Sequence, residues 1–344
     1  MADYVIYAHD IFEGDAVGNH CIDVAAVLAG AGYDVVLAAS NYAKADWRIT
    51  YVDKLPSVVS AQTKLWISFS IYDSHLDELL ALDCKKIFYF HGITPPELLV
   101  ENAPETARLC KRGLEQLKDI GGVDIAFANS KRSLAQLSNW AKFTDIRVVP
   151  PMVDQHRVFS FSNQSCDLSS SKRSFVLAVG RVAPHKNLEQ AIEVFSIMRD
   201  QNPNLFLQVT GAIDPGPYFE VLLRKAEELS VLEQIIFTGK VFEYDLVASY
   251  QRAAFFISTS LHEGFNLPVL EAMHFGVPCI LRSGTAADEF AVPVCRLNDG
   301  ADQGQVSLKE LERVREPVVA AATENSDSLK HSVSNDEWLK IFET

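Results

Sequence analysis

The sequence F-F-I-S-T-S-L-H-E-G-F-N-L-P-V-L-E-A-M occupies residues 255–273 and gives the strongest indication of the fold. Its apolar start, Phe255–Ser258, predicts a buried strand, and Pro268 suits the first position of a helix. A buried strand, a loop and a helix in succession are typical of a parallel sheet covered by helices. The amides of residues 265–270 are then expected to form a free helix N-terminus at a strand end, which is a site for an anion.

Two glutamates flank this predicted anion site. Glu263 lies in the predicted loop, and Glu271 lies one turn inside the predicted helix. Because a carboxylate repels an anion, each glutamate is expected to accept hydrogen bonds from hydroxyl groups, one from a sugar and the other from a ribose. The alternative is that both glutamates merely complement the helix dipole.

A second segment passes from a predicted strand end through a loop into a predicted helix, Leu188–Arg199. It reads Val179-Gly180-Arg181-Val-Ala-Pro-His-Lys186-Asn187-Leu. Arg181 and Lys186 place two cations on a strand-exit loop, at the sheet edge where the glutamates also emerge. Cations fixed there can neutralise a diphosphate without a metal ion. The alternative is an ordinary solvated basic loop.

Short apolar runs alternate with amphipathic segments along most of the chain, which predicts parallel sheets with helices on both faces. A stretch with seven serines, residues 160–174, interrupts this alternation and has the composition of a linker. The fold class is therefore α/β, with two doubly wound Rossmann-like domains that face each other across a cleft. The predicted strands are Tyr4–Ala8, Val35–Ala39, Leu65–Phe69, Ile87–Phe90, Ile125–Ala128, Ile146–Val149, Phe175–Val179, Leu205–Val209, Ile235–Phe237, Phe255–Ser258 and Val277–Leu281.

The domain boundaries follow from this pattern. Residues 1–159 form the predicted N-terminal domain, and residues 175–325 form the predicted C-terminal domain. Residues 298–335 are polar and acidic, and no strand is assigned to them. In the terminal segment, residues 326–344, Trp338, Leu339 and Phe342 have helical spacing, which favours a helix that docks back on the N-terminal domain.

Composition excludes several classes of protein. The 344 residues are 48% hydrophobic and 22% charged, as in ordinary globular proteins, and no apolar run is long enough to cross a membrane. The formal net charge of −14 argues against sequence-independent binding of nucleic acid. Six scattered cysteines and an acidic N-terminus without a signal peptide favour a cytoplasmic protein with reduced thiols.

Common catalytic motifs are missing from the sequence. It contains no P-loop, no G-x-S-x-G and no H-E-x-x-H. It also lacks Asp-x-Asp, the usual carboxylate clamp for a metal-bound nucleotide diphosphate. The segment that starts at Gly30 and Gly32 lacks the third glycine of a dinucleotide fingerprint and is interpreted as a turn between a helix and a strand. We therefore expect no metal and no cofactor.

The combined motifs resemble those of retaining glycosyltransferase family 4, which has the GT-B fold and includes bacterial polysaccharide mannosyltransferases. The resemblance rests on E-x7-E from Glu263 to Glu271 and on G-R-x-x-x-x-K-N from Gly180. It departs at Asn266, where glycine is commonest in the family, and in the short chain after Phe290. Weaker matches in the first half are Gly14-Asp-Ala-Val-Gly-Asn-His20, His91-Gly-Ile-Thr-Pro95, Phe127-Ala-Asn-Ser130 and Val148-Val-Pro-Pro-Met-Val-Asp154.

The resemblance implies that residues 1–159 form the acceptor side and that residues 175–325 bind the nucleotide sugar. It also implies a role for each matching residue. Arg181 and Lys186 would bind the donor diphosphate, Glu271 the ribose, and Glu263 the donor sugar. Backbone groups would add contacts: Gly264, Phe265, Asn266 and Leu267 beside the donor sugar, and Lys240 and Val241 beside the nucleobase. His91 would approach the donor sugar from the N-terminal domain, and the loop around Gly14 would close over phosphate or acceptor.

The implied reaction transfers a sugar from a nucleotide donor, linked to GDP or UDP, to an acceptor hydroxyl with retention of configuration. GDP-mannose is the first expectation for the donor, and a glycan, either soluble or lipid-linked, for the acceptor. His91 taken alone fits a core histidine equally well. The alternatives are a non-catalytic nucleotide-sugar binding module and the epimerase or phosphorylase branch of the same fold; a phosphorylase needs a larger chain.

One further feature concerns membranes. Residues 108–147 contain eight basic against four acidic residues in an otherwise acidic chain. This excess favours weak peripheral contact with the inner face of an anionic membrane, and the alternative is an ordinary solvated helix face. The basic residues are Arg108, Lys111, Arg112, Lys118, Lys131, Arg132, Lys142 and Arg147.

Overall fold

The computed structural model of the chain describes residues 1–12, 14–42, 47, 49–152, 175–298, 306–332 and 334–343. The chain divides into two compact units. One comprises Met1–Pro96, Glu105–Asp154 and Ser332–Thr344, and the other comprises Glu97–Pro104 and Gln155–His331. The predicted linker, residues 160–174, lies outside the described residues.

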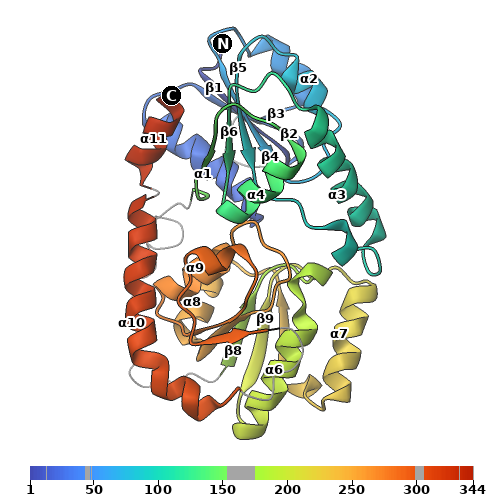
Figure 1. Cartoon of the computed structure of the whole chain (residues 1–344), viewed down its shortest axis with the longest axis vertical. Helices are drawn as coiled ribbons and strands as arrows, with labels where there is room; N and C mark the ends of the chain where they lie inside the picture. Colours follow the sequence, from blue (N-terminus) through green and yellow to red (C-terminus); the bar gives the residue numbers. More distant parts are fainter. Residues whose placement is uncertain are drawn as a thin grey trace. The chain divides into compact units, whose positions relative to one another are not determined.

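The first unit is built on a parallel sheet (Figure 1). Its described strands have the order β3-β2-β1-β4-β5-β6-β7. The chain adds strands on one side of β1 up to β3 and then on the other side from β4 onward, as in a doubly wound fold. They are β1 (Tyr4–Ile11), β2 (Val35–Tyr42), β3 (Ile49–Thr50), β4 (Lys64–Phe69), β5 (Lys85–Phe90), β6 (Ile125–Ala128) and β7 (Ile146–Val148).

Helices connect these strands. They are α1 (Ala16–Gly30), α2 (Leu76–Leu80), α3 (Pro104–Gln116) and α4 (Lys131–Trp140), with short 3₁₀ turns at Val52–Ser57, Pro96–Leu98 and Leu117–Asp119. The terminal helix α11 (Asn335–Glu343) lies beside α1 (Figure 1). Its Trp338 and Phe342 are completely buried in the same hydrophobic cluster as Trp66 and Tyr89, so α11 completes the core of the first unit.

The second unit has a parallel sheet with the order β10-β9-β8-β11-β12-β13 among its described strands. Val176 and Ala178 face a cluster formed with α6 and α7, whereas Leu177 faces a cluster formed with α8 and α9. The sheet is therefore covered on both faces. The strands are β8 (Phe175–Val179), β9 (Phe206–Thr210), β10 (Ile235–Gly239), β11 (Phe255–Ser258), β12 (Cys279–Arg282) and β13 (Cys295–Leu297).

The helices of the second unit are α6 (Leu188–Gln201), α7 (Pro217–Glu228), α8 (Glu243–Arg252), α9 (Leu267–His274) and α10 (Leu308–Ser332). Shorter 3₁₀ turns occupy Pro184–Lys186, Leu232–Gln234 and Ala286–Glu289. The prediction that Gly30 and Gly32 form a turn is confirmed, because α1 ends at Gly30 and Gly32 has a positive φ of 95° before β2. The described cysteines are all free.

The eleven predicted strands are confirmed, with ends that differ by up to three residues. Two further strands, β3 and β13, were not predicted, because neither contains an apolar run long enough to indicate a strand. Residues 308–332, to which no structure was assigned, form α10. No described helix combines the length and the apolar character that crossing a membrane requires.

Candidate functional site

Two glycines bring the strand ends of the second unit close together. Gly180 and Gly211, which follow β8 and β9, have positive φ values of 146° and 147°. A Cβ on Gly211 would lie 2.1 Å from the carbonyl oxygen of Gly180, so no side chain fits there. The amide of Gly180 donates to the carbonyl of Thr210 (2.9 Å), which holds the loop that carries Arg181 and Lys186 at the carboxyl edge of the sheet.

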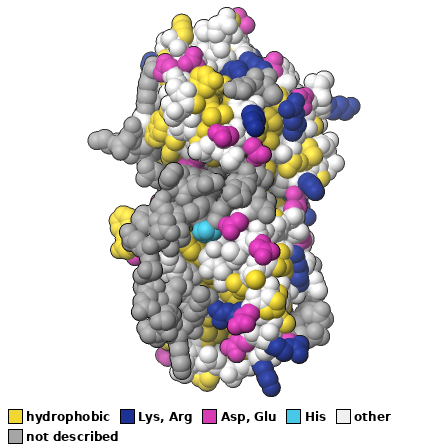
Figure 2. All heavy atoms as spheres, turned by 90° about the vertical axis from the view of Figure 1, so that its left-hand side faces the viewer, with side chains coloured by type: hydrophobic (Ala, Val, Ile, Leu, Met, Phe, Trp, Pro, Cys, Tyr) yellow, Lys and Arg dark blue, Asp and Glu magenta, His cyan; other side chains and the backbone are white. Residues whose placement is uncertain are grey.

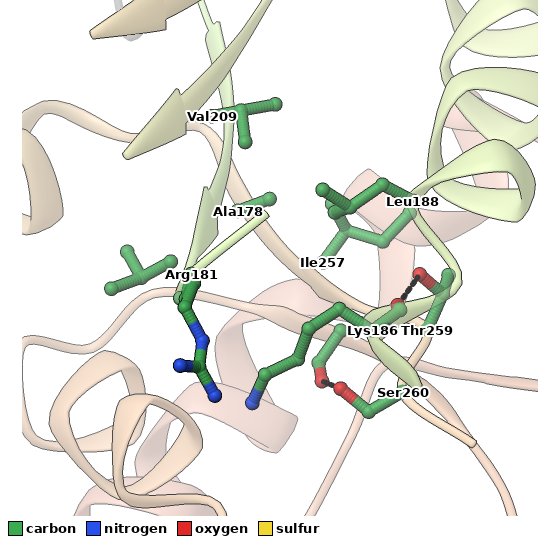
Figure 3. Close-up of a pocket in the computed structure, with 11 residues that line it drawn as sticks. Ala178, Arg181, Lys186, Leu188, Val209, Ile257, Thr259 and Ser260 are labelled. Atoms are coloured by element: carbon green, nitrogen blue, oxygen red, sulfur yellow. Dashed lines mark hydrogen bonds between the residues drawn. The ribbon is translucent and has the colours of Figure 1, made fainter. Parts of the chain in front are cut away.

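Arg181 and Lys186 line one pocket, together with Ser258 and Ser260 from the end of β11 (Figure 3). Both cationic side chains extend toward the same space in that view. Arg181 is exposed, whereas the Lys186 side chain is only 19% exposed. The structure therefore brings the two predicted phosphate-binding cations together.

Glu263 is the partner of Lys186. Its Oε1 lies 2.7 Å from the Lys186 Nζ and accepts a second hydrogen bond of 2.7 Å from the Ser260 hydroxyl. The Glu263 side chain is 12% exposed, so this ion pair is largely shielded from water. The pair joins residues 77 positions apart in the sequence and orients both side chains at the pocket.

The loops after β8 and β11 are also tied together through the backbone. The Thr259 hydroxyl donates to the carbonyls of Lys186 (3.1 Å) and Asn187 (2.8 Å). The amide of Leu261 donates to the carbonyl of His185 (2.8 Å). These bonds fix the two loops relative to each other within the second unit.

His185 is a buried histidine in the loop after β8. Burial lowers its pKa to about 2, and the adjacent charges of Lys186 and Arg181 act in the same direction. The imidazole is therefore neutral at physiological pH. The charges of Lys186 and Arg181, which add to the effect of burial, also favour an anion at the pocket.

Asn266 starts α9 in a left-handed conformation (φ 78°, ψ 59°), and its side-chain amide donates to the Ser258 hydroxyl (3.1 Å). Leu267 is the first residue of the helix and Pro268 the second, so the helix starts one residue earlier than Pro268 predicted. One expectation needs correction: the amide of Val269 donates to the carbonyl of Asn266 (3.1 Å), so the open helix N-terminus does not extend through residue 270. Gly264 and Phe265 precede this turn, and the Phe265 ring stacks on Phe290.

Glu271 lies inside α9 and is 8% exposed. Its Oε2 accepts a hydrogen bond of 2.6 Å from the hydroxyl of Tyr250 on α8. Tyr250 is 1% exposed, so this bond holds the carboxylate in one orientation from the core side.

Lys240 and Val241 directly follow β10. Lys240 is exposed, and Val241 lines a separate groove of about 450 Å³ with Thr238, Asp245 and Ser249, between the sheet and α8. These two residues therefore do not line the pocket of Arg181 and Lys186.

His91 follows β5 in the first unit. Its amide donates to the carbonyl of Phe69 (3.0 Å), and its carbonyl accepts from the side chain of Asn129 (3.0 Å). Burial lowers the pKa of His91 to about 3, so the ring is neutral. Its buried Nε2 has no hydrogen-bond partner among the described residues, and the ring packs edge-on against His20.

Gly14 has a positive φ of 80° before α1, and its amide donates to the Asn19 side chain (3.0 Å). The next residue, Asp15, caps α1 by accepting from the amides of Val17 (3.1 Å) and Gly18 (3.3 Å). The cap brings a negative charge to that helix N-terminus and uses amides that could bind phosphate.

Of the polar residues that line the pocket, the sequence indicated Arg181 and Lys186 but gave no role to Ser258, Thr259 and Ser260, and it also missed Tyr250, the partner of Glu271. Serine and threonine carry no distinctive spacing, and Tyr250 meets Glu271 only because α8 and α9 pack on the same face of the sheet. No group of three or more His, Cys, Asp or Glu side chains within the described ranges converges to hold a metal ion.

Comparison with known proteins adds independent findings. Residues 164–293, which include Arg181, Lys186, Glu263 and Glu271, match the family model "Glycosyl transferases group 1". The chain is 27% identical over 184 residues to serotype-specific mannosyltransferase WbdA of Escherichia coli, covering 51% of this chain and 23% of WbdA. It is 32% identical over 124 residues to a GDP-mannose-dependent alpha-(1-6)-phosphatidylinositol monomannoside mannosyltransferase of Mycolicibacterium smegmatis, covering 34% of this chain and 32% of that protein. These matches span less than a third of the length of either relative.

Solved structures confirm the predicted fold. Sucrose-phosphate synthase from Thermosynechococcus elongatus matches with a TM-score of 0.76 at 15% identity, covering 99% of this chain and 97% of that chain. HepE from Anabaena, solved with UDP and glucose, matches with a TM-score of 0.72 at 12% identity, covering 100% and 99%. The chain has the GT-B fold of two Rossmann-like domains. The family model and the mannosyltransferase relatives support a glycosyltransferase.

Proposed function

We propose that this protein is a retaining glycosyltransferase that moves a sugar from a nucleotide-sugar donor to an acceptor hydroxyl. The observation that carries the proposal is the pocket of the second unit, where Arg181 and Lys186 extend toward one space and Glu263 holds Lys186. Mannose from GDP-mannose is the proposed donor, supported by the mannosyltransferase relatives.

The two cations are the proposed source of most of the rate acceleration. Bond cleavage leaves negative charge on the departing diphosphate, and donors preorganised toward that charge lower the barrier most effectively. Lys186 is held by Glu263 and therefore needs little reorganisation before it meets a phosphate oxygen. The N-terminus of α9 adds partial positive charge at the same sheet edge.

Glu263 is proposed as a sugar-binding residue and not as a covalent nucleophile. Its Oε1 already accepts hydrogen bonds from Lys186 and Ser260, and both donors stabilise the carboxylate and reduce its nucleophilicity. Hydroxyl groups of the sugar can still donate to the other oxygen. The proton of the acceptor hydroxyl then passes to the leaving phosphate oxygen, so the reaction requires no separate general base.

The remaining assignments follow the resemblance. Glu271 is proposed to accept hydrogen bonds from the ribose, with Tyr250 orienting its carboxylate. The backbone of Gly264–Leu267 is proposed to contact the donor sugar, and that of Lys240 and Val241 the nucleobase. His91 is proposed as a sugar-binding residue of the first unit, and the loop around Gly14 as part of the acceptor side.

The alternative proposal is a nucleotide-sugar binding module without turnover. It would use the same pocket and bind the donor as tightly. Slow hydrolysis of the donor, with water as the acceptor, distinguishes the two proposals because it needs no knowledge of the natural acceptor.

Donor hydrolysis in EDTA with the variants Arg181→Ala and Lys186→Ala tests the proposal. Each variant should reduce the turnover rate about 10²–10³-fold, because each removes a donor to the developing negative charge. Lys225→Ala is the matched control, since Lys225 forms a comparable ion pair with Glu193 (2.9 Å) on the surface between α6 and α7.

The same experiment tests metal independence. We expect wild-type hydrolysis to persist in EDTA, since protein cations take the place of a divalent ion. Near-normal turnover in both variants would reject the assigned roles, and activity that is lost in EDTA and restored by magnesium would reject the metal-free mechanism.

A further inference from the structure

Strand β10 lies at the edge of the second sheet. Within the part of the chain that the structure describes, β9 is the one strand that pairs with it, so the backbone groups on its other side have no strand partner there. The strand reads Ile235-Ile-Phe-Thr-Gly239 and carries no charged side chain. Its pairing with β9 is regular as far as Phe237 and shifts before Gly239. Uncharged edge strands are prone to associate with another chain.

Large apolar side chains are exposed around this edge. Ile236 on β10 is 48% exposed, and Phe206 at the start of β9 is 38% exposed. Phe242, which follows β10 and directly precedes α8, is 78% exposed. Exposed apolar side chains that gather in one place mark a surface for association.

Phe206 and Ile236 lie on the face of the sheet that carries α8, opposite α6 and α7 (Figure 1). They alternate with Leu207 and Ile235, which are buried in the cluster formed with α6 and α7. Phe206 and Ile236 also line the groove of about 450 Å³ between the sheet and α8. Because both side chains are exposed, this groove is open to solvent beside the edge strand.

The two ends of the edge are complementary to each other. At the starting end, Glu233 precedes β10 and the groove exposes its apolar lining. At the carboxyl end, Lys240 and Phe242 follow β10, and both are exposed. A two-fold axis through the middle of β10 would run two copies of the strand antiparallel, so that the starting end of each copy meets the carboxyl end of the other.

This arrangement uses the apolar and the charged groups of the edge twice. Phe242 of each copy reaches the open groove of the other, and Lys240 of each copy lies near Glu233 of the other. Arg252 at the end of α8 lines the same groove, where its guanidinium can stack on the incoming aromatic ring. The backbone groups on the outer sides of the two β10 strands can pair with each other.

We propose that the β10 edge is the interface of a symmetric dimer of this protein, in which Phe242 of each copy occupies the groove of the other. A second copy fits this surface because the same edge carries both the apolar side chain and the groove that receives it. The net charge of −14 opposes self-association, so the dimer is expected to be reversible. The inference goes beyond the proposed function and does not depend on it.

Sedimentation velocity of the purified full chain at a series of concentrations tests the inference. The average mass should rise with concentration from that of one chain to that of two. Phe242→Asp should weaken dimerisation strongly. Because the axis places each residue in the interface twice, a tenfold loss at each site becomes a change of about a hundredfold in the dimerisation constant.

Tyr51→Asp is the matched control for this variant. Tyr51 is also an exposed aromatic residue (53%), but it belongs to the first unit. The same change from an aromatic ring to a carboxylate should therefore leave the dimerisation constant unchanged. Circular dichroism of each variant verifies that it is folded.

Charge reversal tests the antiparallel arrangement itself. Glu233→Lys and Lys240→Glu each bring like charges together at both ends of the interface, and each should weaken dimerisation about tenfold. The double variant Glu233→Lys/Lys240→Glu exchanges the two charges and should restore the wild-type constant. A merely structural role of either residue predicts no such restoration.

The inference is overturned if the wild type stays monomeric at every concentration, if Phe242→Asp dimerises as well as wild type, or if the double charge reversal dimerises no better than the single variants. A small molecule or a different protein would then be the occupant of the groove. Donor hydrolysis, measured separately, tests the proposed function alone, so the failure of either proposal can be recognised without the other.

Discussion

The structure explains why asparagine can take the place of glycine at position 266. Its φ of 78° lies in the left-handed region, which costs most residues about 1–2 kcal/mol but which glycine adopts freely and asparagine more readily than others. The side-chain amide bonds the Ser258 hydroxyl and so connects the start of α9 to the end of β11. Asparagine thus combines the conformation of glycine with an extra hydrogen bond.

We therefore expect Asn266→Ala to destabilise the protein more than Asn266→Gly. Alanine loses the hydrogen bond and also incurs the left-handed strain, a difference between the two variants of about 1–2 kcal/mol. Urea unfolding monitored by circular dichroism measures both free energies. Equal stability of the two variants would mean that the loop relaxes to another conformation.

Helix α11 shows how a short terminal element can be essential to a domain core. Trp338 and Phe342 are 0% and 1% exposed, and their rings pack against Trp66 (5.8 and 5.1 Å between centroids). The carbonyl of Phe342 accepts a hydrogen bond from the Tyr4 hydroxyl (3.2 Å) and one from Lys64. The helix is thus anchored by both its apolar face and its last turn.

Trp338→Ala should lower the free energy of unfolding of the first unit by about 3–5 kcal/mol, the usual effect of removing a large buried ring. Leu339→Ala is the matched control, because Leu339 is adjacent but only partly buried and should cost clearly less. Tryptophan fluorescence during urea unfolding follows the first unit through Trp66. Similar losses in the two variants would contradict the proposed anchoring by Trp338.

The elements that could be predicted from the sequence are those with a strong local pattern. Buried strands such as β6 and β11 are continuous apolar runs, and α11 has apolar residues at helical spacing. The long helix α10 was not predicted because its sequence is polar and contains Pro317, and because few of its side chains with described burial are buried, among them Leu311 and Ala322. Its formation depends on tertiary packing that local patterns do not encode.

The same distinction applies to the candidate site. The strand-exit loops with Arg181, Lys186 and Glu263 could be predicted from the sequence, because the strands that precede them could be predicted. The direct Lys186–Glu263 bond and the contact of Tyr250 with Glu271 join different elements, so only the fold reveals them. The approach of the His9 ring on β1 to the carboxylate of Asp73 after β4 (3.7 Å) likewise depends on the adjacency of these two strands.

Buried histidines in both units link the stability of the whole protein to pH. Burial lowers the pKa of His20, of His91 (to about 3) and of His185 (to about 2). Below pH 6.5 the unfolded chain therefore binds protons that the folded chain rejects, and stability falls with decreasing pH. His9 acts in the opposite direction, because its pKa is raised and its contribution is lost as the pH rises.

We expect the free energy of unfolding to decrease from pH 6.5 downward, by at most about 1.4 kcal/mol per pH unit for each buried histidine. Urea midpoints measured at successive pH values give this slope. His91→Gln should reduce the slope, whereas His75→Gln, a change at the surface, should not. An unchanged slope in His91→Gln would show that His91 is not buried as a neutral ring.

The excess of basic residues in 108–147 bears on whether the protein adsorbs to an anionic surface. Ion pairs reduce the free charge of this region, since Arg108 pairs with Glu105 and Arg147 with Asp145 (2.6 Å). The guanidinium of Arg112 lies over the Tyr72 ring (3.6 Å) and the ammonium of Lys118 over the Trp140 ring (5.0 Å). Figure 2 shows a different face, turned away from α3, on which acidic and basic side chains are interspersed. Any attraction to an anionic surface is therefore modest.

Flotation with phosphatidylglycerol vesicles at low and high salt tests this attraction. Each basic residue near an anionic surface contributes about 1 kcal/mol within a Debye length, and the net charge of −14 opposes adsorption. We expect partial binding at low salt that disappears at high salt and in the absence of anionic lipid. Lys111→Glu should abolish it, and Lys309→Glu, which changes an exposed lysine on α10 by the same charge, should only weaken it. Failure of the wild type to float at low salt would remove the membrane contact and favour a soluble acceptor.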